Sequence, residues 1–176
     1  MRIISGIFKG RRIFPPRNIT ARPTTDFAKE SLFNLLNNRM DLEDIDVLDL
    51  FAGTGGISIE CVSRGCREAV SVELAQRQAD FIRKITNELK IKNLTLIRGD
   101  VFKYVASTKK QFDFIYADPP YDLPTLETIP DLIFEHELLK EDGLFILEHS
   151  AKNDFSTHPH FVEHRKYGNV NFSFFE

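Results

Sequence analysis

The run Asp118-Pro119-Pro120-Tyr121, which follows an apolar stretch over 112–117, combines residue types that suit chemistry on an amine. The Asp118 carboxylate and the Pro119 carbonyl can accept hydrogen bonds from both N–H groups of one NH2 group. Proline fixes φ, so both acceptors are in place before the amine arrives. Tyr121 adds an aromatic face on which a planar base can stack. We predict that these four residues act on the exocyclic amine of a nucleic-acid base; the alternative is an ordinary loop.

A glycine-containing loop over 49–55 follows another apolar stretch and opens a predicted helix. Glycine permits positive φ and lets the backbone approach a ligand closely. The loop lacks the Gly-x-Gly-x-x-Gly pattern of dinucleotide sites and begins with an acid, which would repel a pyrophosphate. An acid favours the ammonium and sulfonium groups of S-adenosylmethionine, so we expect this cofactor rather than NAD. The residues that we expect to hold it here are Asp49, Phe51, Ala52, Gly53, Thr54 and Gly55.

Two further acids stand where a nucleoside could be held. Glu73 ends the next predicted strand, 20 residues after Gly53, where a carboxylate can accept hydrogen bonds from both ribose hydroxyls. Asp100 follows the third predicted strand and is placed to accept from an adenine amino group. Capping of the following helix is the alternative for each, and for Asp100 the two roles are compatible. Leu74 and Val101, their neighbours, complete the predicted cofactor site.

Strands alternating with helices can bring these residues together. The predicted strands cover 47–50, 69–72, 94–97, 112–117 and 144–148, and the predicted helices cover about 56–64, 76–89, 101–105 and 126–134. This alternation is typical of a parallel sheet with helices on both faces, in which ligands bind beyond the carboxyl ends of the strands. Two last strands, 164–167 and 170–175, flank the hairpin signal Gly168-Asn169. We therefore predict an α/β, Rossmann-like fold with a mostly parallel seven-stranded sheet and an antiparallel C-terminal hairpin.

The beginning of the chain is basic. Residues 1–40 contain eight basic and two acidic residues, a net charge of +6, which leaves −9 of the total −3 for residues 41–176. A basic segment on an acidic body is typical of phosphate contact, and a solvated basic surface is the alternative. We expect residues 1–22 to form a small basic β-extension, with short strands at 3–4 and 12–14 turned at Lys9-Gly10.

A helix is predicted over 27–37, after the possible N-caps Thr24, Thr25 and Asp26. Its predicted apolar face consists of Phe27, Leu32, Phe33, Leu35 and Leu36.

With these motifs, the chain resembles the RsmD-type 16S rRNA guanine-N2 methyltransferases of bacteria, over nearly its whole length. The segment Arg22-Pro23-Thr24-Thr25-Asp26 is more specific than the glycine loop, which most methyltransferases of this fold share. The other segments that carry the resemblance are residues 2–6, 9–12, 30–34, 49–55, 118–121 and 166–168. Departures from the family pattern are Tyr121 in place of a phenylalanine found in some relatives, Ser5 where glycine is common, and the short, divergent region 149–165.

The resemblance implies a class I S-adenosylmethionine-dependent methyltransferase domain over 23–176, acting on one guanine N2 of 16S rRNA. The substrate would be the small ribosomal subunit or an assembly intermediate, and the flipped-out base would receive the methyl group in line. By similarity, Asp118, Pro119 and Tyr121 are catalytic, and Asp49, Gly53, Glu73 and Asp100 bind the cofactor. We expect RNA contacts from Lys9, Arg11, Arg12, Arg22 and Thr24, and we place Arg22, Thr24 and Asp26 at the active-site wall as a hypothesis.

Other classes of protein remain as alternatives. A DNA adenine-N6 methyltransferase shares the tetrapeptide but usually carries a larger recognition region, and glutamine-N5 protein methyltransferases typically have Asn at the position of Asp118. A non-catalytic RNA-binding assembly factor would not need Asp49 and Asp118. The five histidines and the two cysteines lack metal-ligand spacing, so we expect no metal. No apolar run is long enough for a bilayer and no signal peptide is evident, so we expect a cytoplasmic protein.

Overall fold

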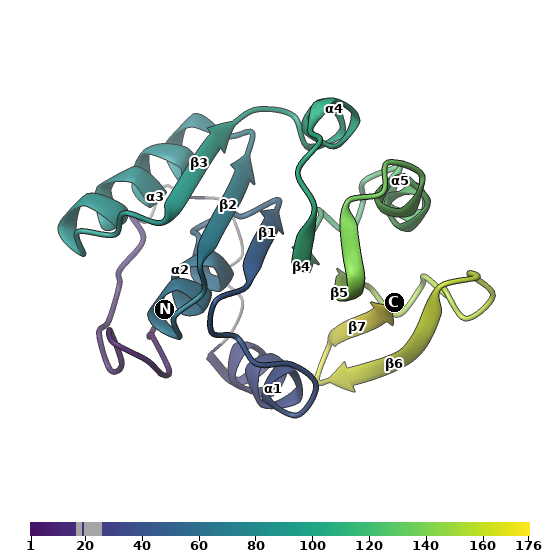
Figure 1. Ribbon diagram of the computed structural model, residues 1–176, viewed down its shortest axis with the longest axis horizontal. Coiled ribbons are helices and arrows are strands. Elements are labelled where there is room, and N and C mark those ends of the chain that lie inside the picture. Colours follow the sequence, from purple (N-terminus) through teal and green to yellow (C-terminus); the bar gives the residue numbers. More distant parts are fainter. Residues whose placement is uncertain (17–18, 20–25) are drawn as a thin grey trace.

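The computed structural model describes residues 1–16, 19 and 26–176, which build one seven-stranded sheet in the order β3-β2-β1-β4-β5-β7-β6 (Figure 1). Strands β1 to β5 run parallel, whereas β7 runs antiparallel to both β5 and β6. The strands are β1 (Asp46–Leu50), β2 (Glu68–Glu73), β3 (Leu94–Arg98), β4 (Phe112–Ala117), β5 (Leu139–His149), β6 (Phe161–Tyr167) and β7 (Val170–Phe175). The predicted mostly parallel sheet with its antiparallel C-terminal hairpin is confirmed.

The connecting segments cover both faces of the sheet. The helices are α1 (Asp26–Asn37), α2 (Gly56–Ser63), α3 (Gln76–Glu88), α4 (Val101–Ser107), the short 3-10 helix η1 (Leu126–Thr128) and α5 (Ile129–Glu135). Helices α1 to α3 lie on one face and α4 and α5 on the other (Figure 1). Every residue of β1 is buried, because apolar side chains from both layers pack against it.

The chain reverses its winding direction between β1 and β4, which are neighbours in the sheet. The connections from β1 through β2 to β3 use one face, and those from β3 through β4 to β5 use the other. Such a switch point leaves a crevice beyond the carboxyl ends of the two central strands, where ligands of parallel α/β folds bind. The loops after β1 and β4 meet at this edge.

Helix α1 confirms the predicted helix and four of the five residues of its predicted apolar face, with Phe27 as the exception. Phe27 is 66% exposed, whereas Lys29 is only 1% exposed. The Lys29 ammonium donates to the carbonyl of Arg2 at 2.5 Å and lies 3.4 Å from the Glu60 carboxylate, so its charge is compensated. Phe27 is therefore a wrong prediction for the core, and Lys29 takes the buried place. The possible caps Thr24 and Thr25 lie outside the described residues.

The N-terminal segment forms one antiparallel bridge, between Arg2 and Arg12, instead of the two predicted short strands. The amides of Ile4 and Ser5 donate to the Glu60 carboxylate at 2.9 and 3.0 Å, so they are not available to a partner strand. The chain also reverses over a longer segment than the predicted turn at Lys9-Gly10. This segment extends from Gly6 to Gly10, which have positive φ values of 80° and 83°. Ile3 and Ile13 then pack against α2 and α3, so the segment adheres to the body.

Three other boundaries differ from the predictions. The helix expected over 126–134 is divided into η1 and α5, because Pro130 occupies the first turn of α5 and cannot donate a hydrogen bond back to η1. Strand β5 begins at Leu139 rather than at 144, through a pairing with Phe112 that precedes a break in register. The polar residues 140–142 conceal this start in the sequence. Strand β6 begins at Phe161, within the segment that the sequence marks as divergent.

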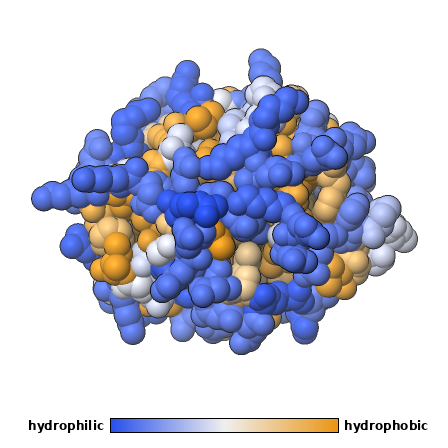
Figure 2. All heavy atoms as spheres, in the orientation of Figure 1, coloured by the Kyte–Doolittle hydropathy of each residue, from blue (hydrophilic) through white to orange (hydrophobic). Residues whose placement is uncertain are grey.

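The surface agrees with a polar globular body. Hydrophilic side chains predominate on the face that Figure 2 shows, and its apolar patches are small and scattered. Among the residues that the structure describes, no helix has the length and apolarity needed to cross a bilayer.

Candidate active site

The tetrapeptide 118–121 leaves the end of β4 and lies beside the loop that follows β1. The amide of Asp118 donates to the carbonyl of Leu50, the last residue of β1, at 3.3 Å. This hydrogen bond holds the starts of the two loops side by side. A turn then follows, with the amide of Leu123 donating to the carbonyl of Pro120 at 2.9 Å. Pro119 is buried, whereas Pro120 and Tyr121 are exposed, so the aromatic ring is at the surface of this edge. The structure thus brings the tetrapeptide and the glycine loop together.

The glycine loop has an unusual backbone. Phe51, Gly53 and Gly55 all have positive φ, at 59°, 56° and 74°. Glycine at 55 is favoured by its positive φ, and a Cβ there would also lie 3.1 Å from Cγ1 of Ile82, a tight contact. The amide of Ala52 donates to the carbonyl of Val72 at 3.0 Å, which secures the loop to β2. A strained non-glycine residue such as Phe51 is typical of a ligand-binding turn.

Thr54 completes this loop and is buried. Its hydroxyl lies 3.8 Å from the sulfur of Met1, so the N-terminal segment packs directly on the loop.

Asp49 lies beneath the loop, only 2% exposed. Its carboxylate accepts from the amide of Ser58 at 3.1 Å and from the Ser58 hydroxyl, which also contacts the hydroxyl of Ser71 at 2.6 Å. Burial raises the pKa of Asp49 to about 7, more than the Ser58 hydrogen bonds lower it. Asp49 therefore secures the start of α2 and carries a charge that is sensitive to pH near neutrality.

Glu73 ends β2 and secures the loop from the other side. One carboxylate oxygen accepts from the amide of Gly53 at 2.7 Å, and the other accepts from the amide of Ala75 at 2.8 Å. The spacing of 20 residues from Gly53 thus corresponds to a direct contact. Leu74, the next residue, is 64% exposed, an apolar side chain at the surface beside this acid. The helix-capping alternative considered for Glu73 is not observed, because Ala75 precedes α3 and, among the described residues, no side chain caps the amides of the first turn of that helix.

Asp100 caps α4. Its carboxylate accepts from the amide of Lys103 at 3.0 Å, as the alternative reading of the sequence expected. Val101 is buried in the core, and Phe102 contacts the ring of Phe51 edge-on at 6.3 Å between centroids. The start of α4 is therefore in contact with the loop after β1. The predicted cofactor residues in the loops after β1, β2 and β3 thus lie at the same edge of the sheet, beyond the carboxyl ends of the strands.

Sequence reasoning missed Glu148, the penultimate residue of β5. Its carboxylate is 5% exposed and accepts from the Tyr121 hydroxyl at 2.8 Å and from the Tyr116 hydroxyl at 2.5 Å. The signal available in the sequence was a lone acid at the end of an apolar run over 144–147, a position equivalent to those of Glu73 and Asp118.

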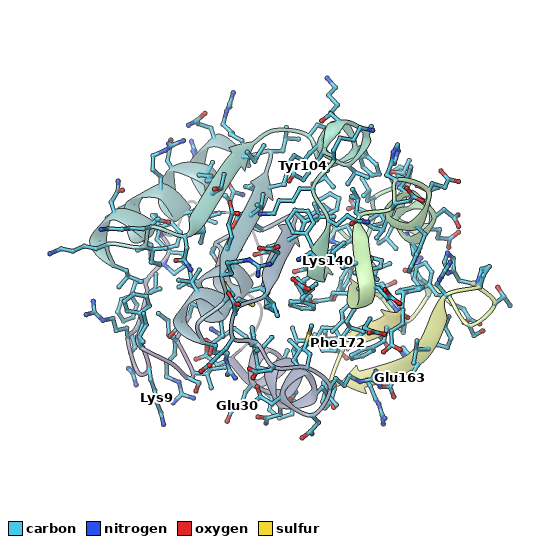
Figure 3. All side chains as sticks on the ribbon, in the orientation of Figure 1. Lys9, Glu30, Tyr104, Lys140, Glu163 and Phe172 are labelled. Atoms are coloured by element: carbon cyan, nitrogen blue, oxygen red, sulfur yellow. The ribbon has the colours of Figure 1, made fainter. Side chains whose placement is uncertain are left out.

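The predicted RNA-contacting residues Lys9, Arg11 and Arg12 are exposed on the N-terminal segment. Lys9 extends outward from the body of the molecule (Figure 3). The guanidinium of Arg11 lies over the ring of Phe8, 5.7 Å from its centroid. Arg22 and Thr24 lie outside the described residues. Asp26, the third residue assigned to the active-site wall, accepts from the amide of Arg2 at 3.1 Å.

Within the described ranges 1–16, 19 and 26–176, no three His, Cys, Asp or Glu side chains are grouped so that they could hold a metal ion. Cys61 and Cys66 are both free and buried.

Comparisons with known proteins agree with this geometry. A family model described as "Conserved hypothetical protein 95" matches residues 1–176. "Putative rRNA methyltransferase YlbH" of Bacillus subtilis is 38% identical over 159 residues, which cover 86% of this chain and 84% of that protein. "Ribosomal RNA small subunit methyltransferase D" of Buchnera aphidicola is 32% identical over 148 residues, which cover 84% of this chain and 75% of that protein.

A solved structure supports the same assignment. "Putative methyltransferase yhhF from Escherichia coli" superposes with a TM-score of 0.86 at 26% identity and covers 99% of this chain and 96% of that one. Because the family model spans the whole chain and relatives at 38% and 32% identity cover most of it, this protein belongs to the RsmD-type family of rRNA methyltransferases, described as Conserved hypothetical protein 95.

Proposed function

We propose that this protein transfers a methyl group from S-adenosylmethionine to the exocyclic N2 of a guanine in 16S rRNA. The observation that carries the proposal is the junction of the tetrapeptide with the glycine loop, through the hydrogen bond from Asp118 to Leu50. The tetrapeptide, which we expect to accept the amine, thus lies at the same edge of the sheet as the loop over 49–55, which we expect to hold the cofactor. The name of the Buchnera relative, which specifies the ribosomal RNA of the small subunit, supports the choice of substrate.

The residues at this edge fit S-adenosylmethionine. Each oxygen of the Glu73 carboxylate accepts one backbone N–H and retains a second lone pair, which suits two ribose hydroxyls. The exposed side chain of Leu74 offers an apolar surface to an adenine ring, and the acid Asp49 favours a cationic ligand. Glycine at positions 53 and 55 gives the loop the positive φ values that its tight turn requires. When bound, the cofactor supplies an electrophilic methyl group on a sulfonium.

The tetrapeptide prepares the amine. The Asp118 carboxylate and the Pro119 carbonyl accept the two N–H groups of guanine N2, which directs the nitrogen lone pair away from the ring plane. The Asp118 carboxylate would hold the proton that the amine nitrogen loses once it has taken up the methyl group. Tyr121 stacks on the base, which must first leave its helical stack. The two prolines hold these groups in place before the base arrives, which adds to the rate.

The basic segment supplies the RNA contact in this proposal. Lys9, Arg11 and Arg12 form no ion pair within the described part of the chain, so their charges are available to phosphates. We retain residues 1–22 as the RNA-contacting extension and 23–176 as the methyltransferase domain. The small ribosomal subunit or an assembly intermediate is the proposed partner.

Mapping the product tests the proposal. The protein is incubated with radiolabelled S-adenosylmethionine and, in separate reactions, small subunits lacking the modification, protein-free 16S rRNA and duplex DNA. Digestion to nucleosides should yield labelled N2-methylguanosine from one of the two RNA samples. Label on adenine N6 in DNA, or on a ribosomal protein, would overturn the proposal. Calorimetry that showed no S-adenosylmethionine binding would leave only a non-catalytic assembly factor.

A further inference from the structure

A buried carboxylate beneath the tetrapeptide joins an exposed ring to the interior. Glu148, on β5, accepts from the hydroxyl of Tyr121 with one oxygen, at 2.8 Å, and from the hydroxyl of Tyr116 with the other, at 2.5 Å. Tyr116 is 1% exposed and belongs to β4, whereas Tyr121 is 36% exposed and belongs to the loop after β4. Glu148 therefore connects the loop to two central strands.

Burying this acid has a cost that an apolar side chain would avoid. A carboxylate removed from water destabilises the fold unless hydrogen bonds compensate for the lost hydration. The neighbouring residues of β5, over 143–147, are buried, and most are apolar. The Tyr116 hydroxyl holds one oxygen of Glu148 in place, which leaves the second oxygen directed at the surface ring.

We propose that Glu148 is a positioning residue that holds the ring of Tyr121 where the target base stacks. The inference rests on the proposed function, because the base is the ligand that the ring would meet. A surface tyrosine without a tether exchanges between side-chain rotamers, and each binding event would have to order it again. A tethered ring is ordered before the base arrives. Loss of the tether should therefore lower kcat/KM for the RNA substrate and leave the affinity for the cofactor unchanged.

A double-mutant cycle separates this role from a merely structural one. The variants are Glu148→Leu, which removes both acceptors, Tyr121→Phe, which keeps the ring but removes the hydroxyl, and the two combined. Glu141→Leu is the matched control, because Glu141 is an exposed glutamate at the other end of the same strand. For each variant we would measure kcat/KM for small subunits, the dissociation constant for S-adenosylmethionine and the thermal unfolding midpoint.

We expect Glu148→Leu and Tyr121→Phe each to lower kcat/KM for the subunit about tenfold, with cofactor affinity within twofold of wild type. The double variant should be no worse than Glu148→Leu, since both changes break the same contact. Losses that multiply to about 100-fold in the double variant, or a Tyr121→Phe protein at the wild-type rate, would overturn the inference. If Glu148→Leu did not fold, Tyr121→Phe would still decide the question.

A measurement without substrate distinguishes failure of this inference from failure of the proposed function. The chain has four tyrosines, so fluorine NMR of protein labelled with 3-fluorotyrosine should give four assignable signals. Glu148→Leu should shift the signals of Tyr116 and Tyr121 but not those of Tyr104 and Tyr167, and Glu141→Leu should shift none. An unmoved Tyr121 signal would overturn the tether itself, whereas absence of any methyl transfer by the wild-type protein would overturn the proposed function.

Discussion

Three buried acids, Asp49, Glu73 and Glu148, each end up at the carboxyl-terminal edge of a different strand. Each accepts hydrogen bonds from donors of a loop or helix beside that edge: Ser58 for Asp49, Gly53 for Glu73 and Tyr121 for Glu148. A buried carboxylate is tolerated where hydrogen-bond donors compensate for its lost hydration, and such groups are common at functional sites. At this edge they shape the loops and favour a cationic ligand.

Asp49 makes the stability of the fold depend on pH. Its pKa is raised from 3.8 to about 7 by burial, so the native state holds a proton that the unfolded chain has lost between about pH 4 and pH 7. The free energy of unfolding should therefore decrease as pH rises through this window, by about 4 kcal/mol in total, and level off above pH 7. Urea unfolding of wild type and Asp49→Asn from pH 4.5 to 8 measures this difference. Parallel curves for the two proteins would contradict the assignment.

The sequence was informative for residues that sit at a fixed spacing from a motif. Glu73 was found from its distance to Gly53, and that distance corresponds to a hydrogen bond. Glu148 and Lys29 were missed, because the burial of each depends on partners distant in sequence, Tyr121 and Glu60. Spacing patterns do not reveal such long-range partners.

At the scale of elements, the N-terminal segment is joined to α2 at very short range. The amide of Ile7 donates to the carbonyl of Ser63 at 2.8 Å, and the Ser63 hydroxyl donates to the carbonyl of Ser5 at 2.6 Å. A Cβ on Gly6 would lie 1.6 Å from that Ser63 carbonyl oxygen, so the contact requires glycine. Gly10 has a similar positive φ, but a Cβ there would meet nothing within 4 Å.

These two glycines form a matched pair of sites. Gly10→Ala should cost only the strain of positive φ, about 1 kcal/mol, whereas Gly6→Ala should also detach the segment from α2. We expect faster trypsin cleavage near Lys9 and Arg11 in Gly6→Ala, and a loss of at least 2 kcal/mol of stability in urea. Equal cleavage rates and equal stability losses in the two variants would show that the close approach is unimportant.

The strands and helices of the body were predictable, because each long apolar run is bounded by glycine, proline or polar residues. The run 112–117 matches β4 at both ends. The exact form of the N-terminal segment was not predictable, since its pairing ends at Ile3 where the amides of Ile4 and Ser5 turn to the distant Glu60 carboxylate. The division of the fifth helix depends on Pro130, whose place in a first turn rather than a helix interior depends on the preceding turns.

At the scale of the whole molecule, the charges are separated along the chain. Residues 1–40 carry +6 and the rest carries −9. The described part of the basic N-terminal segment packs on α2 and α3, and α1 covers the same face of the sheet (Figure 1). A net acidic body repels RNA except where the basic segment meets it, which orients the approach of a polyanion.

Salt dependence of RNA binding tests this orientation. Arg11→Ala combined with Arg12→Ala should reduce the slope of log affinity against log salt concentration by about 1 to 2, because each lost phosphate contact contributes roughly 0.7–0.9. The charge-matched control is Lys103→Ala with Lys109→Ala, since both lysines are exposed and lie in α4 and the loop after it, on the other face of the sheet from the N-terminal segment. Identical slopes for the two double variants would show that the segment does not contact the RNA.

The most direct measurement is single-turnover methyl transfer to unmodified small subunits by Asp118→Ala, beside the control Asp122→Ala, which removes an exposed acid next to the tetrapeptide. We predict that Asp118→Ala slows the transfer at least about 100-fold while S-adenosylmethionine affinity stays within twofold of wild type, and that Asp122→Ala reacts normally. An Asp118→Ala protein that methylated guanine at the wild-type rate would contradict the claim that this corner holds the amine.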